Sequence, residues 1–266
     1  MNRWQFIFII LQISDKILSY PLEEPILDDP ELTENYYQGD IEYPPIKSRN
    51  GIHSETFRWP NGLVYYHIGE RQFDQDQKKH IELAMDIISG FSCIRFQEVP
   101  SSATSYLNIT SYKPGCSVDK IGWENNVRNM NLKSNNVGFG CFRLGTILHE
   151  LLHVLGFKHQ HVAANRDEYI YIHWKNIKPK YWNDFLHDHK KQPLHNFGED
   201  YDYNSVMHYS RYAFTIDRKL MTIEPIKKGG ERMGQRIFLS KKDITKLNEM
   251  YKCELRGNLP KSYLQI

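Results

Sequence analysis

The stretch His149–His159 reads HELLHVLGFKH, and it decides how the rest of the chain is interpreted. His149 and His153 are four residues apart, so on a helix both imidazoles project from one face and can bind the same metal ion. Gly156 can adopt the left-handed backbone conformation that ends a helix, and the resulting turn can bring His159 round as a third ligand. Three neutral imidazoles leave one position of a tetrahedral zinc ion open, which is the arrangement of a catalytic site.

Glu150 follows the first ligand and lies about 100° further round the helix. From there its carboxylate can reach a water molecule on the metal without binding the ion itself. Zinc lowers the pKa of such a water to about 7, so the carboxylate can take its proton and deliver it to a leaving amine. The five fixed positions of the motif are those of the metzincin proteases. They are His149, Glu150, His153, Gly156 and His159. The motif therefore predicts an enzyme that hydrolyses peptide bonds with one Zn²⁺ per chain.

Outside this motif, the histidines receive a simpler interpretation. His187 and His189 flank Asp188 and could hold a metal, but a solvated polar face is favoured for so short a pattern. Downstream, Ser205–Tyr209 reads SVMHY and looks like the Met-turn that lies beneath the zinc site in metzincins. Met207 would then form an apolar floor under the imidazoles, although a single methionine is normally only a filler of the core.

The formal net charge of +2 conceals an asymmetry between the two ends of the chain. Residues 1–49 carry nine acidic and four basic side chains, a net charge of −5, which leaves +7 on residues 50–266. An acidic leader of this kind is either a segment that lies on the basic body and is later removed, or a solvated acidic tail. No basic run is dense enough to indicate a nucleic-acid partner.

The first 19 residues are typical of a secretory signal peptide. Arg3 precedes the apolar run 4–13, and Ser19 offers a cleavage point. That run is shorter than the roughly 20 residues that span a bilayer, so no membrane anchor is expected; the alternative is a buried N-terminal helix. Four cysteines fit an oxidising, extracellular location and suggest two disulfides, with three possible connectivities. Asn108 begins the one glycosylation sequon, and the sequence does not decide whether it is modified.

Turn signals and apolar periodicity predict a mixed α+β domain without regular alternation. A turn at Pro60–Gly62 should feed a strand, and Asp74 should cap a helix that Gly90 ends. A loop-rich stretch carrying Cys116 and Cys141 is expected to precede the helix of the zinc motif. The remaining expected elements are strands at 63–68, 93–96, 106–110 and 169–172, and helices at 146–155 and after Ser240, where Asp243 completes the cap and Ile244, Leu247 and Tyr251 share a face.

Several motifs together resemble the astacin family over residues 50–253. They are CIRF from Cys93, Gly115-Cys116, the zinc motif, SVMHY, and the final run from Gly234-Gln235-Arg236 to Leu239-Ser240. The resemblance implies an endopeptidase acting on protein or peptide substrates. It also implies a two-lobed α+β fold, with a twisted N-terminal sheet and two helices in one lobe, an irregular C-terminal lobe, and zinc at the floor of the cleft between them.

The resemblance also implies roles for particular residues. Tyr209 would bind zinc in the resting enzyme and swing away to stabilise the oxyanion. The disulfides would be Cys93–Cys253 and Cys116–Cys141. Arg236 would line the pocket just past the scissile bond, which hints at acidic residues there. Residues 254–266 would form only a short tail.

The N-terminal segment 20–49 is expected to be a pro-segment that keeps the enzyme latent. Residues 37–41 read YQGDI and resemble the FxGD motif of astacin pro-segments, whose aspartate, here Asp40, occupies the open position of the zinc; an acidic solvated turn is the alternative. Counting from Trp59 places the start of the mature domain at Asn50, directly after Arg49, a bond for an activating trypsin-like protease.

Departures from the family pattern follow the third ligand. Relatives have a glutamate there, which receives the freed terminal amine; this chain has Gln160, followed by Ala163 and Asn165 at further family positions. An amide accepts a hydrogen bond but carries no charge, so the new terminus should be held less tightly. A secreted zinc-binding protein without catalysis is the alternative function, against which the intact Glu150 and Tyr209 argue. A zincin with a carboxylate third ligand is disfavoured because His159 already fits that role.

Overall fold

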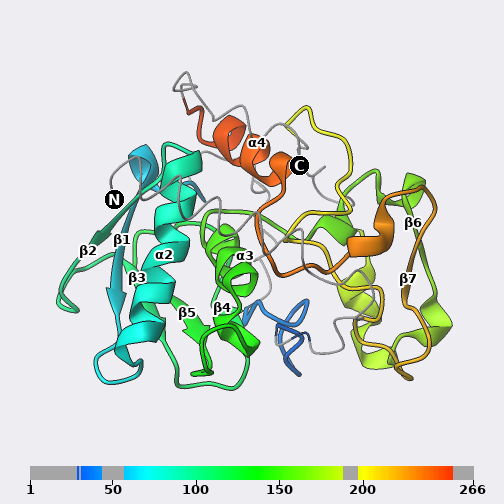
Figure 1. The fold of residues 1–266 in the computed structure, drawn as a ribbon, viewed down its shortest axis with the longest axis horizontal. Coiled ribbons are helices and arrows are strands. Elements are labelled where there is room, and N and C mark those ends of the chain that lie inside the picture. The colour runs from blue at the N-terminus through cyan, green and yellow to red at the C-terminus, as the bar shows by residue number, and fades with distance from the viewer. Residues whose placement is uncertain (1–28, 30, 44–56, 188–196, 254–266) are drawn as a thin grey trace.

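The computed structural model describes residues 29, 31–43, 57–187 and 197–253, and it has the predicted α+β architecture (Figure 1). One lobe is built on a five-stranded sheet of order β2-β1-β3-β5-β4. Strands β2, β1, β3 and β5 are parallel to their neighbours, whereas β4 runs antiparallel to β5 at one edge. The strands are β1 (Leu63–Ile68), β2 (Arg95–Glu98), β3 (Leu107–Thr110), β4 (Cys116–Val118) and β5 (Arg128–Leu132).

Two helices, α2 (Gln75–Phe91) and α3 (Leu144–Val154), pack against each other and against the sheet. Asp74 caps α2 in a reciprocal capping box with Gln77, as the sequence predicts. The helix does not end at Gly90, however. It continues to Phe91 because that side chain is buried in the core, and tertiary packing outweighs the low helix propensity of glycine.

The second lobe is irregular, as expected. Its regular elements are the antiparallel pair β6 (Ile170–Ile172) and β7 (Ile223–Pro225) and short 3₁₀ turns. It has its own apolar core of aromatic and aliphatic side chains, which includes Tyr181, Phe185, Tyr209 and Phe214. The chain therefore forms two packed bodies, and the second relies on aromatic side chains more than on secondary structure.

Helix α4 (Lys241–Met250) comes last in the chain but packs into the first core through Ile244, Leu247 and Met250. Its N-terminus has the predicted capping box of Ser240 and Asp243. The disulfide Cys93–Cys253 ties the end of α4 to the start of β2, and Cys116–Cys141 ties β4 to the turn before α3. Both pairings implied by the family resemblance are confirmed.

Three strands were not expected. The loop-rich stretch before α3 contains β4 and β5, and β7 pairs with the predicted strand at 170–172. All three are three to five residues long. Short strands of this kind are defined by their partners rather than by an alternating pattern, which explains why the sequence did not indicate them.

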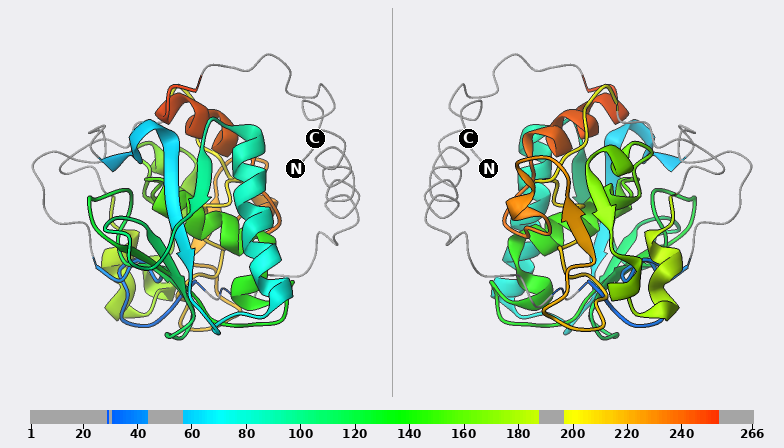
Figure 2. Two further views of the ribbon diagram at one scale, coloured as in Figure 1. Left: turned by 90° about the vertical axis from the view of Figure 1, so that its left-hand side faces the viewer. Right: turned by 90° about the vertical axis from the view of Figure 1, so that its right-hand side faces the viewer.

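The described N-terminal residues, 29 and 31–43, lie between the two lobes (Figure 1, in blue), and Figure 2 shows the same segment from the two sides. Ile41 is fully buried in the first core and forms a parallel bridge with Val118, so this segment extends the sheet beyond the β4 edge. Leu32, further back, packs against the second core. The segment thus contacts both lobes, and we call it the inter-lobe segment.

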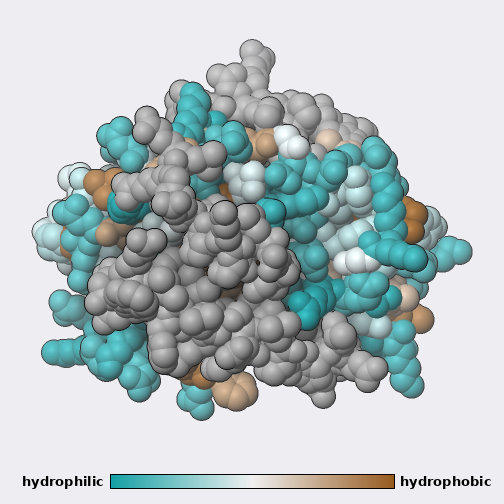
Figure 3. All heavy atoms as spheres, turned by 45° about the horizontal axis from the view of Figure 1, so that its top comes forward, coloured by the Kyte–Doolittle hydropathy of each residue, from teal (hydrophilic) through white to brown (hydrophobic). Residues whose placement is uncertain are grey.

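Several sequence predictions fall outside the described residues: the signal peptide 1–19, the bond after Arg49, residues 188–189 and the tail 254–266. Within the described ranges, no helix is long and apolar enough to cross a membrane. On the face drawn in Figure 3, hydrophilic side chains cover most of the described surface, and apolar ones occur in small groups.

Candidate zinc site

The zinc motif folds as predicted. Helix α3 carries His149 and His153 on one face, and both side chains are fully buried. Gly156 has φ +110°, a left-handed conformation that ends the helical run after its last turn. The chain then turns back and places His159, 1 % exposed, against the other two imidazoles.

A hydrogen bond at Nδ1 orients each of the three imidazoles. The Nδ1–H of His149 donates to the carbonyl of Val206, and that of His153 to the carbonyl of Phe157, both at 2.8 Å. A carbonyl can only accept, so each of these rings is the tautomer with a free lone pair on Nε2. The Nδ1 of His159 bonds instead to the side-chain oxygen of Gln38, at 2.9 Å, in the inter-lobe segment.

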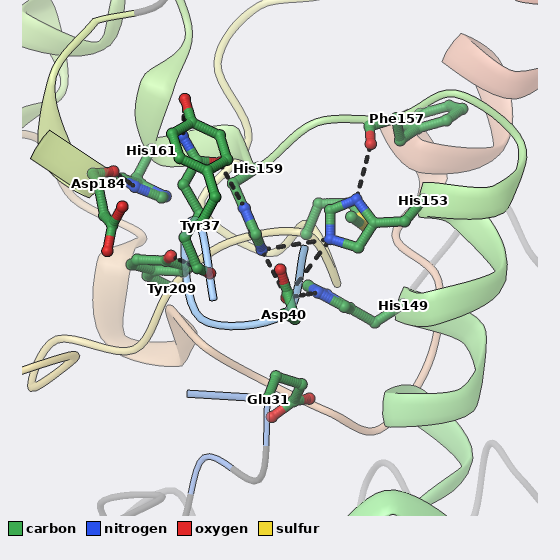
Figure 4. Close-up of polar contacts among 12 residues, drawn as sticks. Glu31, Tyr37, Asp40, His149, His153, Phe157, His159, His161, Asp184 and Tyr209 are labelled. Carbon is green, nitrogen blue, oxygen red and sulfur yellow. Dashed lines mark hydrogen bonds and ion pairs between the residues drawn. The ribbon is translucent and has the colours of Figure 1, made fainter. Parts of the chain in front are cut away.

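All three Nε2 atoms point at the carboxylate of Asp40 (Figure 4). The distances to Asp40 Oδ2 are 3.0 Å from His149, 3.4 Å from His153 and 2.9 Å from His159. Lone pairs and a carboxylate that converge in a buried site repel one another unless a cation lies among them. Three imidazoles and a carboxylate with ligand atoms within 4.8 Å of one another match the donor set of tetrahedral zinc.

Glu150 lies beside this cluster and is fully buried. Neither of its carboxylate oxygens has a hydrogen-bond partner among the described residues. Burial raises the pKa of Glu150 well above its ordinary value, and the neighbouring carboxylates of Asp40 and Glu31 raise it further. A cation held by the histidines acts in the opposite direction, so the ionisation of this group depends on the metal.

The Met-turn contacts the first zinc ligand, because the carbonyl of Val206 accepts from His149. Met207 is 1 % exposed and belongs to the first core, and its role as an apolar floor under the imidazoles stays a prediction. The turn is held by Asp243 at the start of α4, which accepts hydrogen bonds from the Val206 N–H at 2.9 Å and from Ser205 Oγ at 2.6 Å. Because Val206 in turn accepts from His149, the helix cap and the first ligand are connected through one residue.

Tyr209 was expected to bind the metal in the resting enzyme. In this structure its hydroxyl donates instead to the carbonyl of Gln38 at 2.6 Å, and Asp40 faces the three histidines. The ring stacks on His161, with centroids 3.7 Å apart. Tyr209 therefore lies beside the centre and is held by the inter-lobe segment.

Arg236 also meets the inter-lobe segment. Its side chain is almost fully buried, and Nε lies 2.5 Å from a carboxylate oxygen of Glu31. Burial acts to raise the pKa of Glu31, but the Arg236 guanidinium, the nearby His149 and the hydrogen bonds to the carboxylate together outweigh burial and lower that pKa below its ordinary value. Sequence reasoning did not single out Glu31; the acidic excess of the leader was the one signal that pointed to this region.

Gln160 has a partner that the sequence did not suggest. Its side-chain oxygen accepts a hydrogen bond of 2.8 Å from the ammonium of Lys246 on α4. Elsewhere, His187 bonds to Asp167 at 2.7 Å on the surface. Within the described ranges, the group of side chains able to hold a metal is the one around Asp40.

Comparison with known proteins matches residues 51–252 to the family model of the astacin peptidases. The chain belongs to the astacin family. It is 45 % identical to seminal metalloprotease 1 of Drosophila melanogaster over 231 residues, which cover 86 % of this chain and 91 % of that protein. The low choriolytic enzyme of Oryzias latipes is 35 % identical over 229 residues, covering 83 % and 79 % of the two chains.

A solved astacin structure has the same fold. High choriolytic enzyme 1, a hatching enzyme zinc-protease from Oryzias latipes, superposes with a TM-score of 0.65 at 33 % identity and covers 74 % of this chain and 94 % of its own. Family membership and the histidine geometry together make this chain a zinc metalloendopeptidase, with His149, His153 and His159 as the protein ligands of the metal.

Proposed function

We propose that this astacin is a secreted endopeptidase whose precursor is kept latent by the inter-lobe segment. The observation that carries the proposal is the position of Asp40, whose carboxylate occupies the side of the three histidines that a catalytic water needs. Gly39 makes this approach feasible. It has φ +83°, and a Cβ there would lie 2.9 Å from the Glu31 carbonyl, so a larger residue would push the segment away.

The segment blocks catalysis at three points. Asp40 faces the metal ligands, the carbonyl of Gln38 holds the hydroxyl of Tyr209, and Glu31 pairs with Arg236. Each contact occupies a group that is proposed to take part in catalysis or to bind the substrate. Removal of residues 20–49 by a trypsin-like cut after Arg49 releases all three at once.

In the processed enzyme, the residues act as follows. Zinc, when bound, polarises the scissile carbonyl and lowers the pKa of a water molecule to about 7. Glu150 takes the proton of that water and passes it to the leaving amine nitrogen, for which its unpartnered carboxylate is available. The phenol of Tyr209, freed from Gln38, donates a hydrogen bond to the oxyanion.

Arg236 is proposed to select an acidic side chain just past the scissile bond. The ion pair between Arg236 and Glu31 supports this proposal. In the precursor, the Glu31 carboxylate binds the guanidinium that would bind an acidic side chain of the substrate in the processed enzyme. Secretion is supported by the two disulfides, which form in oxidising compartments, and by the signal-like pattern of residues 1–19.

The catalytic proposal is tested with processed protein carrying Glu150→Gln. We expect cleavage of a denatured protein substrate to fall at least a thousandfold while one zinc per chain is retained, because Glu150 acts on water and not on the metal. His153→Ala should lose both the zinc and the activity. Glu82→Gln, an exposed glutamate on α2, is the matched control and should change neither. Full activity of Glu150→Gln would refute its role, and a zinc-loaded wild-type protein without any cleavage would favour the non-catalytic zinc-binding alternative.

A further inference from the structure

One face of α4 contacts two segments next to the zinc ligands, the Met-turn and the turn that follows His159. Asp243 holds Val206, the acceptor for His149. One turn later, Lys246 donates to Gln160, the residue that follows the third ligand. These contacts are spaced at the helical period, so a single rigid element braces two sides of the metal centre.

The contact made by Lys246 is a buried one. The Lys246 residue is 7 % exposed, as is Gln160, and the hydrogen bond between them joins an ammonium to a neutral amide. Burial lowers the pKa of Lys246, whereas the nearby carboxylates of Asp243 and Asp202 favour its charged form. A hydrogen bond with one ionised partner is roughly twice as strong as a neutral one. The amide of Gln160 is therefore firmly held.

The third ligand differs from the other two in its support. His149 and His153 donate to carbonyls of the enzyme body, whereas the Nδ1 of His159 is bonded to Gln38 of the inter-lobe segment. When that segment leaves, His159 loses this orienting bond. The ring of His159 keeps its contacts with the rings of His161 and Tyr209. The hydrogen bonds that remain beside it are those of Gln160, from its N–H to the Met207 carbonyl at 2.9 Å and from Lys246 to its side chain.

We propose that Lys246 is a positioning residue for the third zinc ligand, acting through Gln160 to fix His159 once the inter-lobe segment has gone. The inference rests on the proposed removal of that segment. It implies that the precursor has two supports for His159, whereas the processed enzyme depends on the one from α4.

The test measures zinc release to a chromogenic chelator, for precursor and processed protein. Lys246→Met keeps the length of the side chain but removes the charge and the donor. We expect it to speed zinc loss from the processed protein about tenfold, the lower end of the effect of losing a group that orients a ligand. In the precursor the change should be smaller, because Gln38 still orients His159. Lys241→Met, an exposed lysine at the start of the same helix, is the matched control and should leave the rate unchanged.

A double-mutant cycle separates positioning from general loss of stability. Gln160→Met removes the acceptor but keeps the backbone bond to Met207. If Lys246 acts through Gln160, the double variant should release zinc no faster than either single variant, because both remove the same interaction. Lys246→Arg, which keeps a cationic donor, should restore much of the retention and covers the case in which Lys246→Met does not fold.

Three results would overturn the inference: additive effects in the double variant, equal effects on precursor and processed protein, or a Lys246→Met rate equal to that of Lys241→Met. Because the readout is metal release, it does not require activity. A protein that holds zinc but cleaves nothing would refute the proposed function while leaving this test intact.

Discussion

At the scale of single residues, the inter-lobe segment supplies a hydrogen-bond acceptor or an anion to buried groups of the site. Asp40 faces three imidazole lone pairs that need a cation, and Glu31 neutralises a buried guanidinium. Both contacts should contribute strongly to the binding of the segment, because a buried ion left without its partner costs several kcal/mol. Latency should therefore depend on few side chains.

Asp40→Ala should give a precursor with substantial activity before any cleavage, because a methyl group cannot ligate zinc and leaves its fourth position to water. The measurement is hydrolysis of a quenched fluorescent peptide by intact precursor, with its length verified by mass. Glu34→Ala is the control, since Glu34 lies in the same segment but forms an exposed pair with Lys180. A mutant precursor as silent as wild type would remove Asp40 from the blocking role.

Arg236→Gln should weaken selection of acidic substrates in the processed enzyme. A charge-assisted hydrogen bond contributes about 1.5–3 kcal/mol, so the ratio of kcat/KM for a peptide with Asp just past the cut over its Asn analogue should fall at least tenfold. Rates on the Asn peptide should change little. An unaltered ratio would show that Arg236 does not contact the substrate at this position.

At the scale of elements, the Met-turn accepts a hydrogen bond from the zinc ligand His149 and also contains a buried polar network. His208 within it is fully buried and accepts a 2.7 Å hydrogen bond from the Tyr201 hydroxyl, which requires a neutral ring. Burial lowers the pKa of His208 to about 4. The unfolded chain, with an ordinary value of about 6.5, binds more protons between these limits, so stability is present above pH 6.5 and is lost as the pH falls toward 4.

His208→Gln should therefore flatten the acid sensitivity of folding. Between pH 7 and pH 5, protonation of His208 in the unfolded chain should lower the free energy of unfolding of the wild-type protein by about 2 kcal/mol. Glutamine does not titrate, so the variant should not show this loss. The measurement compares denaturant midpoints of both proteins at both pH values. Protonation of the zinc ligands affects both proteins alike and cancels in the comparison. The same loss in both proteins would contradict this assignment.

Elements with a strong local signature were predictable, and those that depend on distant partners were not. The zinc helix, the two capping boxes and the turn at Gly156 follow from spacing within a few residues. By contrast, the bond between Lys246 and Gln160 spans 86 positions, and that between Arg236 and Glu31 spans 205. Single-sequence patterns contain no record of such contacts, and the short strands β4, β5 and β7 depend on pairing in the same way.

At the scale of the whole molecule, one segment contacts both cores, and its removal is the switch that we propose. The new terminus at Asn50 was predicted to be held weakly by Gln160. The structure adds a reason, since Gln160 already has the ammonium of Lys246 as its donor. We therefore expect processed protein with one or two extra residues before Asn50 to keep most of its activity.

The comparison needs forms that start at Asn50 and one or two residues earlier, with the sequence of each N-terminus verified. Gln160→Glu provides the contrast, because an anion there could pair with a freed amine, and its thermal stability should depend more on the correct terminus. Severe inactivation of the wild-type form by a one-residue extension would contradict this expectation.

We propose that one zinc site is silent with the inter-lobe segment in place and proteolytic without it. The most direct measurement follows, in one time course of limited trypsin digestion, the loss of residues 20–49 and the cleavage of a protein substrate after trypsin is inhibited. We expect no substrate cleavage at time zero and activity that rises in step with cutting at Arg49. A zinc chelator should abolish this activity, and added zinc should restore it. Full activity of the uncut chain, or a cut, zinc-loaded chain that cleaves nothing, would contradict it.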